Sequence, residues 1–335
     1  MQNIPRITLA QKPTPIDLLK DFPHPATIYV KRDDLTGLIT SGNKVRKLEY
    51  ALADAGQQKA DTIITCGGTQ SNHCRTTAAC CRMLGLSPYL VLRGEPVKPL
   101  DGNLLIDYLL GSEIRYITHK EYEKVDKLME SIARDLREKG RKPYVIPEGA
   151  SNEIGLMGYA ECMAEMKSFI EENKIEAVYA PVGSGGTYAG LLLGKLLYNI
   201  KADLLGVIIC DTIEYFMDKV SKISRKAIDR YNLKITLKQS DIKLIDGYIG
   251  KGYAIPYEAE IKTIEKVARW GVILDVVYGG KTFVGMLNES KNYKKILFVH
   301  TGGIFSIFPY KGNFFSDSIV GNKSSQQLPD YSKIL

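Results

Sequence analysis

The stretch AVYAPVGSGGTYAG, residues 177–190, runs from an apolar segment through glycines and hydroxyl side chains into a second apolar segment. Its first six residues predict a buried strand, and the residues after the glycines predict a helix. A strand that leads through a short loop into a helix is the repeating unit of a parallel sheet covered by helices. This stretch therefore predicts an α/β fold.

The same alternation continues over most of the chain. Apolar, strand-like runs occupy residues 26–34, 61–66, 87–94, 113–118, 142–147, 204–210 and 296–303. Helical patterns occupy residues 46–58, 73–85, 103–111, 121–140, 155–173 and 191–200. The apolar residues of these runs show no strict alternation with polar ones, as expected for a parallel sheet that is buried on both faces.

Composition limits the function classes. The chain has 335 residues, 44% hydrophobic and 25% charged, which suits two globular domains or one large domain with an insertion. The net charge of +7 is scattered and forms no basic stripe, so we expect no nucleic-acid partner. No zinc-like cysteine spacing, signal peptide or membrane-length apolar run is visible. We expect a cytoplasmic protein without a metal site or membrane contact.

The glycine-rich loop Gly183–Thr187 is a candidate anion site. Glycines let the backbone approach a ligand closely, and the free N–H groups of a helix start attract negative charge. Phosphate is the expected anion; the alternative is a tight turn that only packs the helix on the strand. The loop lacks the lysine of a Walker A motif, and only Asp211 could serve as the acid of a dinucleotide site.

A second strand-to-helix loop lies in CGGTQSNHCR, residues 66–75. Ser71, Asn72 and His73 would place side-chain donors beside free backbone amides, an arrangement that suits a carboxylate. The alternative is that Ser71 or Asn72 only caps the helix.

Lys44, in SGNKVRKLEY (residues 41–50), stands near a predicted helix start. The partial positive charge there repels an ammonium group, and shielding from water would lower its pKa further. A neutral amine can form a Schiff base with an aldehyde. The alternative is a solvated surface lysine. A phosphate site, a carboxylate site and such an amine together meet the needs of a pyridoxal phosphate enzyme that acts on an amino acid.

Five motifs resemble those of the fold-type II pyridoxal phosphate enzymes, in the branch of D-cysteine desulfhydrase and 1-aminocyclopropane-1-carboxylate deaminase. They are YVKRDDLTG…SGNKVRKLEY, CGGTQSNHCR, GSGGTYAG, VVYGGKTFVGM and HTGG. The resemblance implies a homodimer with two three-layer parallel-sheet domains, like the β-subunit of tryptophan synthase. It places residues 1–53 and 166–320 in a large cofactor-binding domain and residues 54–165 in a small α/β domain. We interpret residues 321–335 as a polar tail.

The resemblance also implies residue roles. Lys44 would form the Schiff base with pyridoxal 5'-phosphate, and Lys47 would reach its phosphate. Asn72 would bind the ring hydroxyl, and Thr301 the ring nitrogen. The phosphate would be wrapped by Gly183, Ser184, Gly185, Gly186 and Thr187. The alternative for Lys47 is a surface charge that pairs with nearby acidic residues.

Further roles concern the small amino-acid substrate. The resemblance places Gln70, Ser71, Asn72 and His73 at the substrate carboxylate. Tyr253 and Tyr278 match two active-site tyrosines and would join Lys44 and Ser71 as catalytic groups. The alternatives are that both tyrosines belong to the core and that His73 only packs a helix.

Two departures from the deaminase pattern bear on the substrate. Deaminases of this branch tend to have glutamate where Gly279 stands and leucine where Thr301 stands. A hydroxyl at the ring nitrogen weakens the electron sink, which a thiolate leaving group tolerates better than a cyclopropane. We therefore predict α,β-elimination from D-cysteine to pyruvate, sulfide and ammonia. Gly279 fits neither pattern, since desulfhydrases usually carry a small hydroxyl residue at that position. Glu148 and Ser41 are further departures, and neither fixes the substrate.

Several alternatives stay open. The chain could be a 1-aminocyclopropane-1-carboxylate deaminase, or a lyase for another β-substituted amino acid such as cysteate. A relative that binds a phosphate ligand without turnover is a third possibility, which intact Lys44, Asn72 and Tyr278 disfavour. A nicotinamide enzyme is a fourth, which the absence of a clear ribose-binding acid disfavours.

Overall fold

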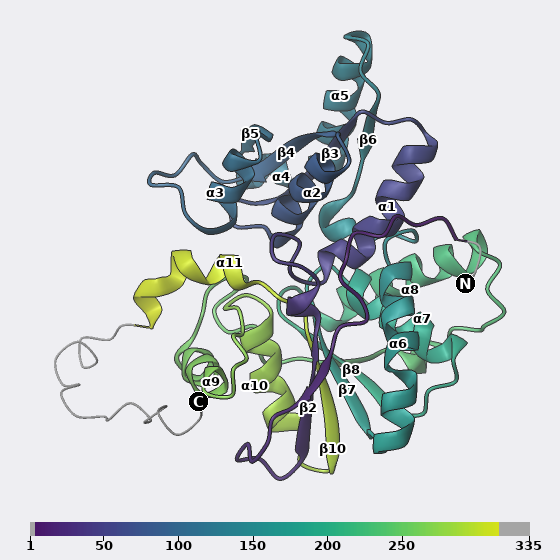
Figure 1. The fold of residues 1–335 in the computed structure, drawn as a ribbon, viewed down its shortest axis with the longest axis vertical. Coiled ribbons are helices and arrows are strands. Elements are labelled where there is room, and N and C mark those ends of the chain that lie inside the picture. Colours follow the sequence, from purple (N-terminus) through teal and green to yellow (C-terminus); the bar gives the residue numbers. More distant parts are fainter. Residues whose placement is uncertain (1–3, 315–335) are drawn as a thin grey trace, which may run out of the picture.

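The computed structural model describes residues 4–314, and these form two α/β parts with one sheet each (Figure 1). The larger sheet has the order β1 (Ile16–Leu18), β2 (Thr27–Arg32), β10 (Lys295–His300), β7 (Ala177–Val182), β8 (Asp203–Ile208) and β9 (Lys243–Ile245). The smaller has the order β5 (Glu113–Ile117), β4 (Ser87–Arg93), β3 (Thr62–Gly68) and β6 (Pro143–Val145). All neighbouring strands are parallel except β1 and β2. The predicted fold class is confirmed.

Helices cover both sheets. The α-helices are α1 (Lys44–Gln57), α2 (Asn72–Met83), α3 (Gly102–Leu109), α4 (His119–Tyr122), α5 (Val125–Glu138), α6 (Met157–Asn173), α7 (Gly186–Leu197), α8 (Ile213–Arg230), α9 (Glu258–Ala268), α10 (Gly279–Glu289) and α11 (Ile304–Ile307). Four 3₁₀ turns complete the helical segments: η1 (Asp33–Leu35), η2 (Glu148–Ala150), η3 (Gln239–Asp241) and η4 (Phe308–Asn313).

One predicted helix is two helices. Residues 121–140 were expected to form one helix, but α4 ends at Tyr122 and α5 begins at Val125. A capping box between Thr118 and Glu121 starts α4 early, and Lys124 between the helices has a non-helical ψ of 24°. The single-helix prediction for this segment is therefore wrong.

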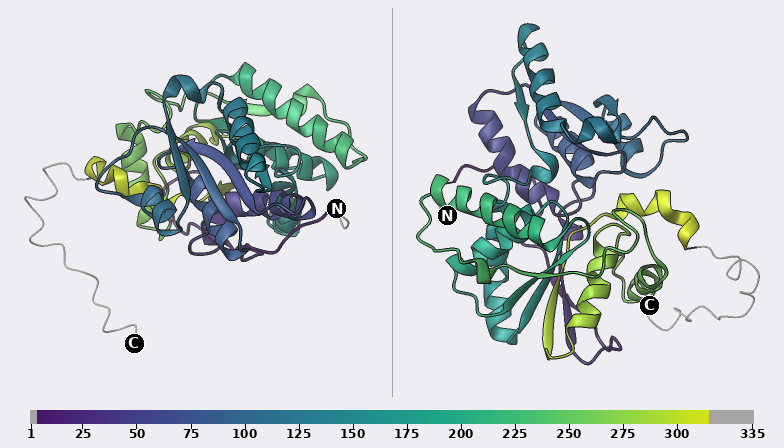
Figure 2. Two further views of the ribbon diagram at one scale, coloured as in Figure 1. Left: turned by 90° about the horizontal axis from the view of Figure 1, so that it is seen from above. Right: turned by 180° about the vertical axis from the view of Figure 1, so that it is seen from behind.

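Helix α1 runs between the two parts (Figures 1 and 2). It packs on α2 of the smaller part and on α6. Helix α6 packs in turn on α7 of the larger part. The proposed domain boundary at residues 53/54 falls inside α1, and the one at 165/166 falls inside α6. Those limits stay a prediction, and the predicted tail at 321–335 lies outside the described residues.

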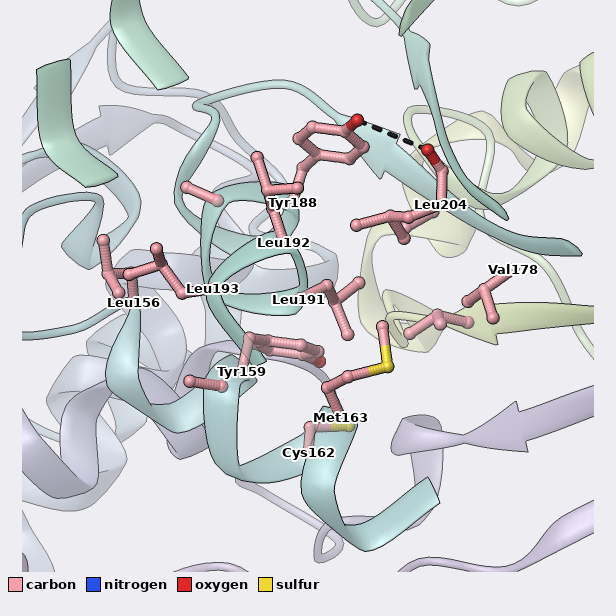
Figure 3. Close-up of a cluster of buried hydrophobic side chains, with 14 of the residues drawn as sticks. Leu156, Tyr159, Cys162, Met163, Val178, Tyr188, Leu191, Leu192, Leu193 and Leu204 are labelled. Carbon is pink, nitrogen blue, oxygen red and sulfur yellow. Dashed lines mark hydrogen bonds between the residues drawn. The ribbon is translucent and has the colours of Figure 1, made fainter. Parts of the chain in front are cut away.

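The main core joins α6 and α7 to the larger sheet (Figure 3). Tyr159 and Met163 of α6 meet Leu191 of α7 and Leu204 of β8, and all four side chains are almost fully buried. The hydroxyl of Tyr188 in this cluster donates to the carbonyl of Lys243 over 2.9 Å, which satisfies a buried polar group. This core gives the glycine loop before α7 a rigid support.

A buried ionic cluster fixes the first turn of α1. The guanidinium of Arg46 donates twice to the Asp33 carboxylate, at 2.8 Å each, and twice to the Glu165 carboxylate, at 2.9 and 3.3 Å. Tyr159 and Thr14 donate to the same Asp33 carboxylate at 2.6 and 2.7 Å. Arg46 and Asp33 are both fully buried. The cluster therefore joins η1, α1 and α6, and its central residue, Arg46, lies two residues after Lys44.

Two global features complete the description. No helix within residues 4–314 combines the length and apolar character needed to cross a membrane. The six cysteines carry free thiols, and all but Cys210 are buried.

Candidate active site

A cavity of about 240 Å³ lies between the two sheets. The smaller part contributes Ser71, His73 and Glu148 to its wall, and the larger part contributes Gly183, Ser184 and Tyr278. Strands β3, β4 and β7 all end at this cavity, with Gly68, Arg93 and Gly183 on its wall. The carboxyl ends of parallel strands are the usual place for a ligand site in α/β proteins.

Lys44 is the first residue of α1 and lines this cavity. Its side chain is only 8% exposed, and its Nζ lies 5.7 Å from the centre of the Tyr278 ring. Burial lowers the pKa of Lys44 to about 8, although the carboxylates of Glu148 and Asp275 oppose that shift. A substantial fraction of the amine is therefore neutral near physiological pH.

Asn43 fixes the position of Lys44. Its backbone N–H donates to the carbonyl of Thr301 over 3.0 Å, and its side-chain amide donates to the Thr187 hydroxyl over 2.9 Å. Asn43 is buried, as are both of its partners. The amine of Lys44 is thus held between the end of β10 and the glycine loop.

The glycine loop opens on the same cavity. Gly185 has a φ of 85°, and α7 begins at the next residue, so its first N–H groups have no partner inside the helix. A Cβ at Gly186 would lie 2.6 Å from the Ser151 hydroxyl, and one at Gly183 would lie 2.7 Å from the Tyr278 ring. The loop can therefore approach Ser151 and Tyr278 this closely only because these positions lack side chains.

Lys219 of α8 adds a cation beside the loop. It lines the cavity, and its Nζ donates to the Tyr215 hydroxyl over 3.0 Å. Its aliphatic stem is the closest neighbour of the Gly185 position besides Val220. Lys219 is a candidate phosphate ligand that the sequence did not reveal.

Lys47 lies behind the loop and does not line the cavity. Its fully buried Nζ donates to the Gly149 carbonyl at 2.8 Å and to the Ser151 hydroxyl at 3.1 Å. The Ser151 and Ser184 hydroxyls are 2.7 Å apart. Burial and the nearby charges of Lys44 and Lys219 lower the pKa of Lys47. Lys47 thus reaches the loop through Ser151, and its direct contact with phosphate stays a prediction.

The start of α2 brings Ser71 to the cavity. Ser71 caps the helix by accepting the N–H of Cys74 over 3.2 Å, which leaves its own proton to donate. The side chains of Gln70 and Asn72 bind Asn103 at the start of α3, each at 2.9 Å, and do not line the cavity. The contacts predicted for Gln70 and Asn72 with substrate or cofactor stay predictions.

His73 lines the cavity as a neutral imidazole. Thr65 donates its hydroxyl proton to the Ile146 carbonyl, so it accepts from His73 Nε2 over 2.8 Å. The Nδ1 atom is then an acceptor, is buried, and has no partner. Burial, followed by the charges of Lys44 and Lys47, lowers the pKa of His73 well below its usual value. His73 therefore suits a hydrogen-bond donor on a ligand better than a carboxylate.

Tyr253 and Tyr278 form a pair with hydroxyl oxygens 2.7 Å apart on the cavity wall. Burial raises the pKa of both phenols, so both stay protonated. The Asp275 carboxylate accepts the backbone N–H groups of Val277, Tyr278 and Gly279 at 2.7–3.0 Å, and so fixes Tyr278 at the start of α10.

Thr301 and Gly279 lie next to these groups. Thr301 is buried, and its backbone carbonyl accepts the N–H of Asn43, the residue before Lys44. A Cβ at Gly279 would lie 2.9 Å from an oxygen of Asp275. A longer side chain at position 279 therefore requires Asp275 to move.

The cavity also contains groups to which the sequence assigned no role, among them Arg93, Tyr122 and Lys219. The position of Arg93 in the sequence could have indicated a site residue, because it is a polar residue at the carboxyl end of a predicted strand. Lys219 lies mid-helix and gave no signal.

Comparison with known proteins agrees with this geometry. A family model described as "Pyridoxal-phosphate dependent enzyme" matches residues 7–302. The chain belongs to this family. Its members use pyridoxal phosphate, so the predicted family and cofactor are confirmed.

Individual family members are similar over nearly their whole length. A Thermotoga maritima protein, provisionally named 1-aminocyclopropane-1-carboxylate deaminase, is 44% identical over 90% of this chain and 97% of its own. A mitochondrial Arabidopsis thaliana protein named bifunctional D-cysteine desulfhydrase/1-aminocyclopropane-1-carboxylate deaminase is 40% identical over 96% and 84%. A solved structure described as an ACC deaminase homologue is 37% identical, with a TM-score of 0.85 over 93% of this chain and 96% of that one.

The cavity fits the family cofactor. It combines a buried amine with a glycine loop at a helix start and a nearby cation, Lys219. Lys44 would hold the carbonyl group of pyridoxal phosphate, and Gly183–Thr187 with Lys219 would hold its phosphate. The individual residue roles remain predictions.

Proposed function

We propose that this enzyme catalyses α,β-elimination on a small amino acid, with D-cysteine as the leading substrate and pyruvate, sulfide and ammonia as products. The observation that carries the proposal is that Lys44 and the glycine loop line one cavity, with Ser71 on the facing part. An amine, a phosphate site and a carboxylate site are thus within the reach of one cofactor–substrate pair.

Pyridoxal phosphate, when bound, withdraws electrons from the α-carbon of the amino acid and so makes its hydrogen acidic. Lys44 is the group suited to take this proton, because its pKa of about 8 keeps part of the amine neutral. Tyr278 holds its own proton, since burial raises its pKa, and so acts as a hydrogen-bond donor. The geometry therefore favours Lys44 over Tyr278 as the base.

The start of α2 would bind the substrate carboxylate. Ser71 has a free proton to donate, and the first N–H groups of α2 add the partial positive charge of a helix start. Holding the carboxylate there and the amine near Lys44 fixes the orientation of the α-hydrogen.

Thr301 supports a thiol substrate over a cyclopropane, because it would give the ring nitrogen only a hydroxyl partner. Gly279 lacks the glutamate that deaminases of this branch tend to have, but it also lacks the small hydroxyl residue usual in desulfhydrases. A glutamate at position 279 would also crowd the Asp275 carboxylate. The second candidate is 1-aminocyclopropane-1-carboxylate deamination, which the names of the relatives support.

A substrate panel tests the proposal. The holoenzyme is supplied with D- and L-cysteine, cysteate and 1-aminocyclopropane-1-carboxylate, and keto acid, sulfide and ammonia are measured separately. We expect pyruvate and sulfide in equal amounts from D-cysteine. Release of a keto acid from the cyclopropane substrate alone would favour the second candidate.

The role of Lys44 is tested by covalent labelling. Borohydride treatment of the yellow holoenzyme should attach the cofactor to Lys44, and Lys44→Ala should lose turnover while keeping its fold. Lys59→Ala, an exposed lysine just after α1, is the matched control. A label on another lysine would contradict the assignment.

We also propose a homodimer and a cytoplasmic location. The loop after η1 supports association, because Leu38 is 88% exposed and Leu35 and Ile39 are partly exposed beside it. Light scattering of the purified holoenzyme measures the oligomeric state, and a monomer at micromolar concentration would contradict the proposed dimer.

A further inference from the structure

Three residues on the cavity wall have no role in the proposed chemistry. Arg93 ends β4, Tyr122 ends α4 and Glu148 begins η2, so all three come from the smaller part. The Tyr122 hydroxyl donates to the Glu148 carboxylate over 2.7 Å. The guanidinium of Arg93 lies 4.6 Å from the centre of the Tyr122 ring and 6.0 Å from that of Tyr253. We call these three residues the distal wall.

Glu148 is the carboxylate that most strongly affects the reacting amine. Its charge raises the pKa of Lys44, and that of Asp275 does so to a smaller extent. Over residues 4–314, Tyr122 supplies the one hydrogen bond to the Glu148 carboxylate, and no cation forms an ion pair with it. One face of the carboxylate thus stays open to the cavity.

The proposed function assigns binding sites to the amine and the carboxylate of the substrate but none to its β-substituent. The amine is next to Lys44 and the carboxylate is at the start of α2, so the β-substituent takes the remaining direction, toward the distal wall. A carboxylate only accepts hydrogen bonds, so it stabilises a group that carries a hydrogen. It repels an anion, and more strongly once the substrate has displaced water from the cavity.

We infer that Glu148, held by Tyr122, selects amino acids whose β-substituent carries a hydrogen on the leaving atom, such as a thiol or an ammonium, over those with an anionic β-substituent, such as a sulfonate. This inference rests on the proposed function. Arg93 keeps its charge and opposes this selection, but contact with the faces of two aromatic rings fixes the position of its guanidinium, whereas the Glu148 carboxylate has one face open to the cavity.

The experiment compares cysteine, 2,3-diaminopropionate and cysteate on the holoenzyme and its Glu148→Gln variant. Elimination from each releases pyruvate, so a single assay gives kcat/KM for all three. The intrinsic quality of each leaving group cancels when the ratio of two substrates is compared between the two proteins. We expect the preference for cysteine and 2,3-diaminopropionate over cysteate to fall about tenfold or more in Glu148→Gln, because a hydrogen bond to a charged group is lost.

Two variants act as controls. Tyr122→Phe removes the group that holds Glu148 and should lower the same ratio by a smaller factor. Glu153→Gln changes a carboxylate five residues later that faces Arg230, outside the cavity, and should leave the ratio unchanged. An unchanged ratio in Glu148→Gln overturns the inference. A wild-type preference for cysteate overturns it too, and would make Arg93 the selecting group.

Different results would contradict the proposed elimination and the proposed role of Glu148. If the wild-type holoenzyme releases pyruvate from none of these substrates, the proposed elimination is wrong. Glu148 is then judged from the dissociation constants of 2,3-diaminopropionate and cysteate, measured by the change in cofactor absorbance. Equal discrimination by wild type and Glu148→Gln would overturn the inference, and a reduced discrimination in the variant would support it.

Discussion

Replacing Arg46 by methionine should destabilise the fold without touching the cavity. The change keeps a long side chain but removes the guanidinium that binds Asp33 twice at 2.8 Å. Asp33 is fully buried, so without Arg46 it keeps a charge that is partnered by neutral donors, the hydroxyls of Tyr159 and Thr14 and the thiol of Cys162. Removing one partner of a buried pair costs about 3–5 kcal/mol. We expect a decrease of this size in the free energy of unfolding.

The stability difference between the wild type and Arg46→Met should depend on pH. Burial raises the pKa of Asp33, but Arg46, together with Lys31 and Tyr159, outweighs burial and leaves that pKa below its usual value. The pair therefore stabilises the fold above the pKa of an unfolded aspartate, about 3.9, and loses that effect as pH falls through the lower folded pKa. In Arg46→Met the charge of Lys31 and the hydrogen bond of Tyr159 remain, but the largest opposing effect is gone, so the pKa of Asp33 rises and its protonation becomes more favourable. The difference between the two proteins should shrink below about pH 4.

Urea unfolding followed by fluorescence measures the effect, because Trp270 is the one tryptophan in the chain. Arg225→Met, an exposed arginine on α8, is the matched control and should change stability by less than about 0.5 kcal/mol. Adding Asp33→Asn to Arg46→Met should recover part of the loss, because it removes the unpaired charge. A loss below about 1 kcal/mol, or one that is constant from pH 3 to 8, would refute the reasoning.

Three further predictions concern the cavity. Lys219→Met should weaken binding of pyridoxal phosphate about tenfold or more but leave binding of pyridoxal nearly unchanged, whereas the exposed Lys222→Met should affect neither; equal losses for both ligands would argue against a phosphate contact. The rate at which apoprotein captures pyridoxal phosphate should rise with pH through about 8, since only neutral Lys44 reacts, and a flat profile from pH 6 to 10 would contradict the lowered pKa. Lys281→Met should speed hydrogen exchange in the loop that carries Tyr253, because Lys281 donates to the carbonyls of Ile249 and Gly252 at 2.7 Å each; unchanged exchange would show that other contacts hold this loop.

The elements that the sequence predicted well are those specified by neighbouring residues. The apolar runs that became β3, β7 and β10 needed no partner to be seen. The helix start at Lys44 follows from a turn-forming Gly-Asn pair directly before a periodic segment. The edge strands β1 and β9 were missed, because each has only three residues and is held by its neighbouring strand.

Side-chain partners across the fold could not be predicted in the same way. Gln70 and Asn72 are occupied by Asn103, about thirty residues later in the chain, so no local pattern shows that they turn away from the cavity. Lys47 was predicted to reach the cofactor phosphate, and its amine donates to the carbonyl of Gly149, about a hundred residues later in the chain. The distal wall is assembled from three separate elements, and only the tertiary structure shows that Glu148 and Arg93 share one cavity.

The double contact of Asn43 has a consequence for motion. It ties the backbone just before Lys44 to Thr187 and Thr301, which both belong to the larger part. Ser71 and Glu148 belong to the smaller part and have no such tie. Any displacement of the smaller sheet would therefore change the distance from Ser71 and Glu148 to Lys44, while Lys44 and the glycine loop keep their spacing.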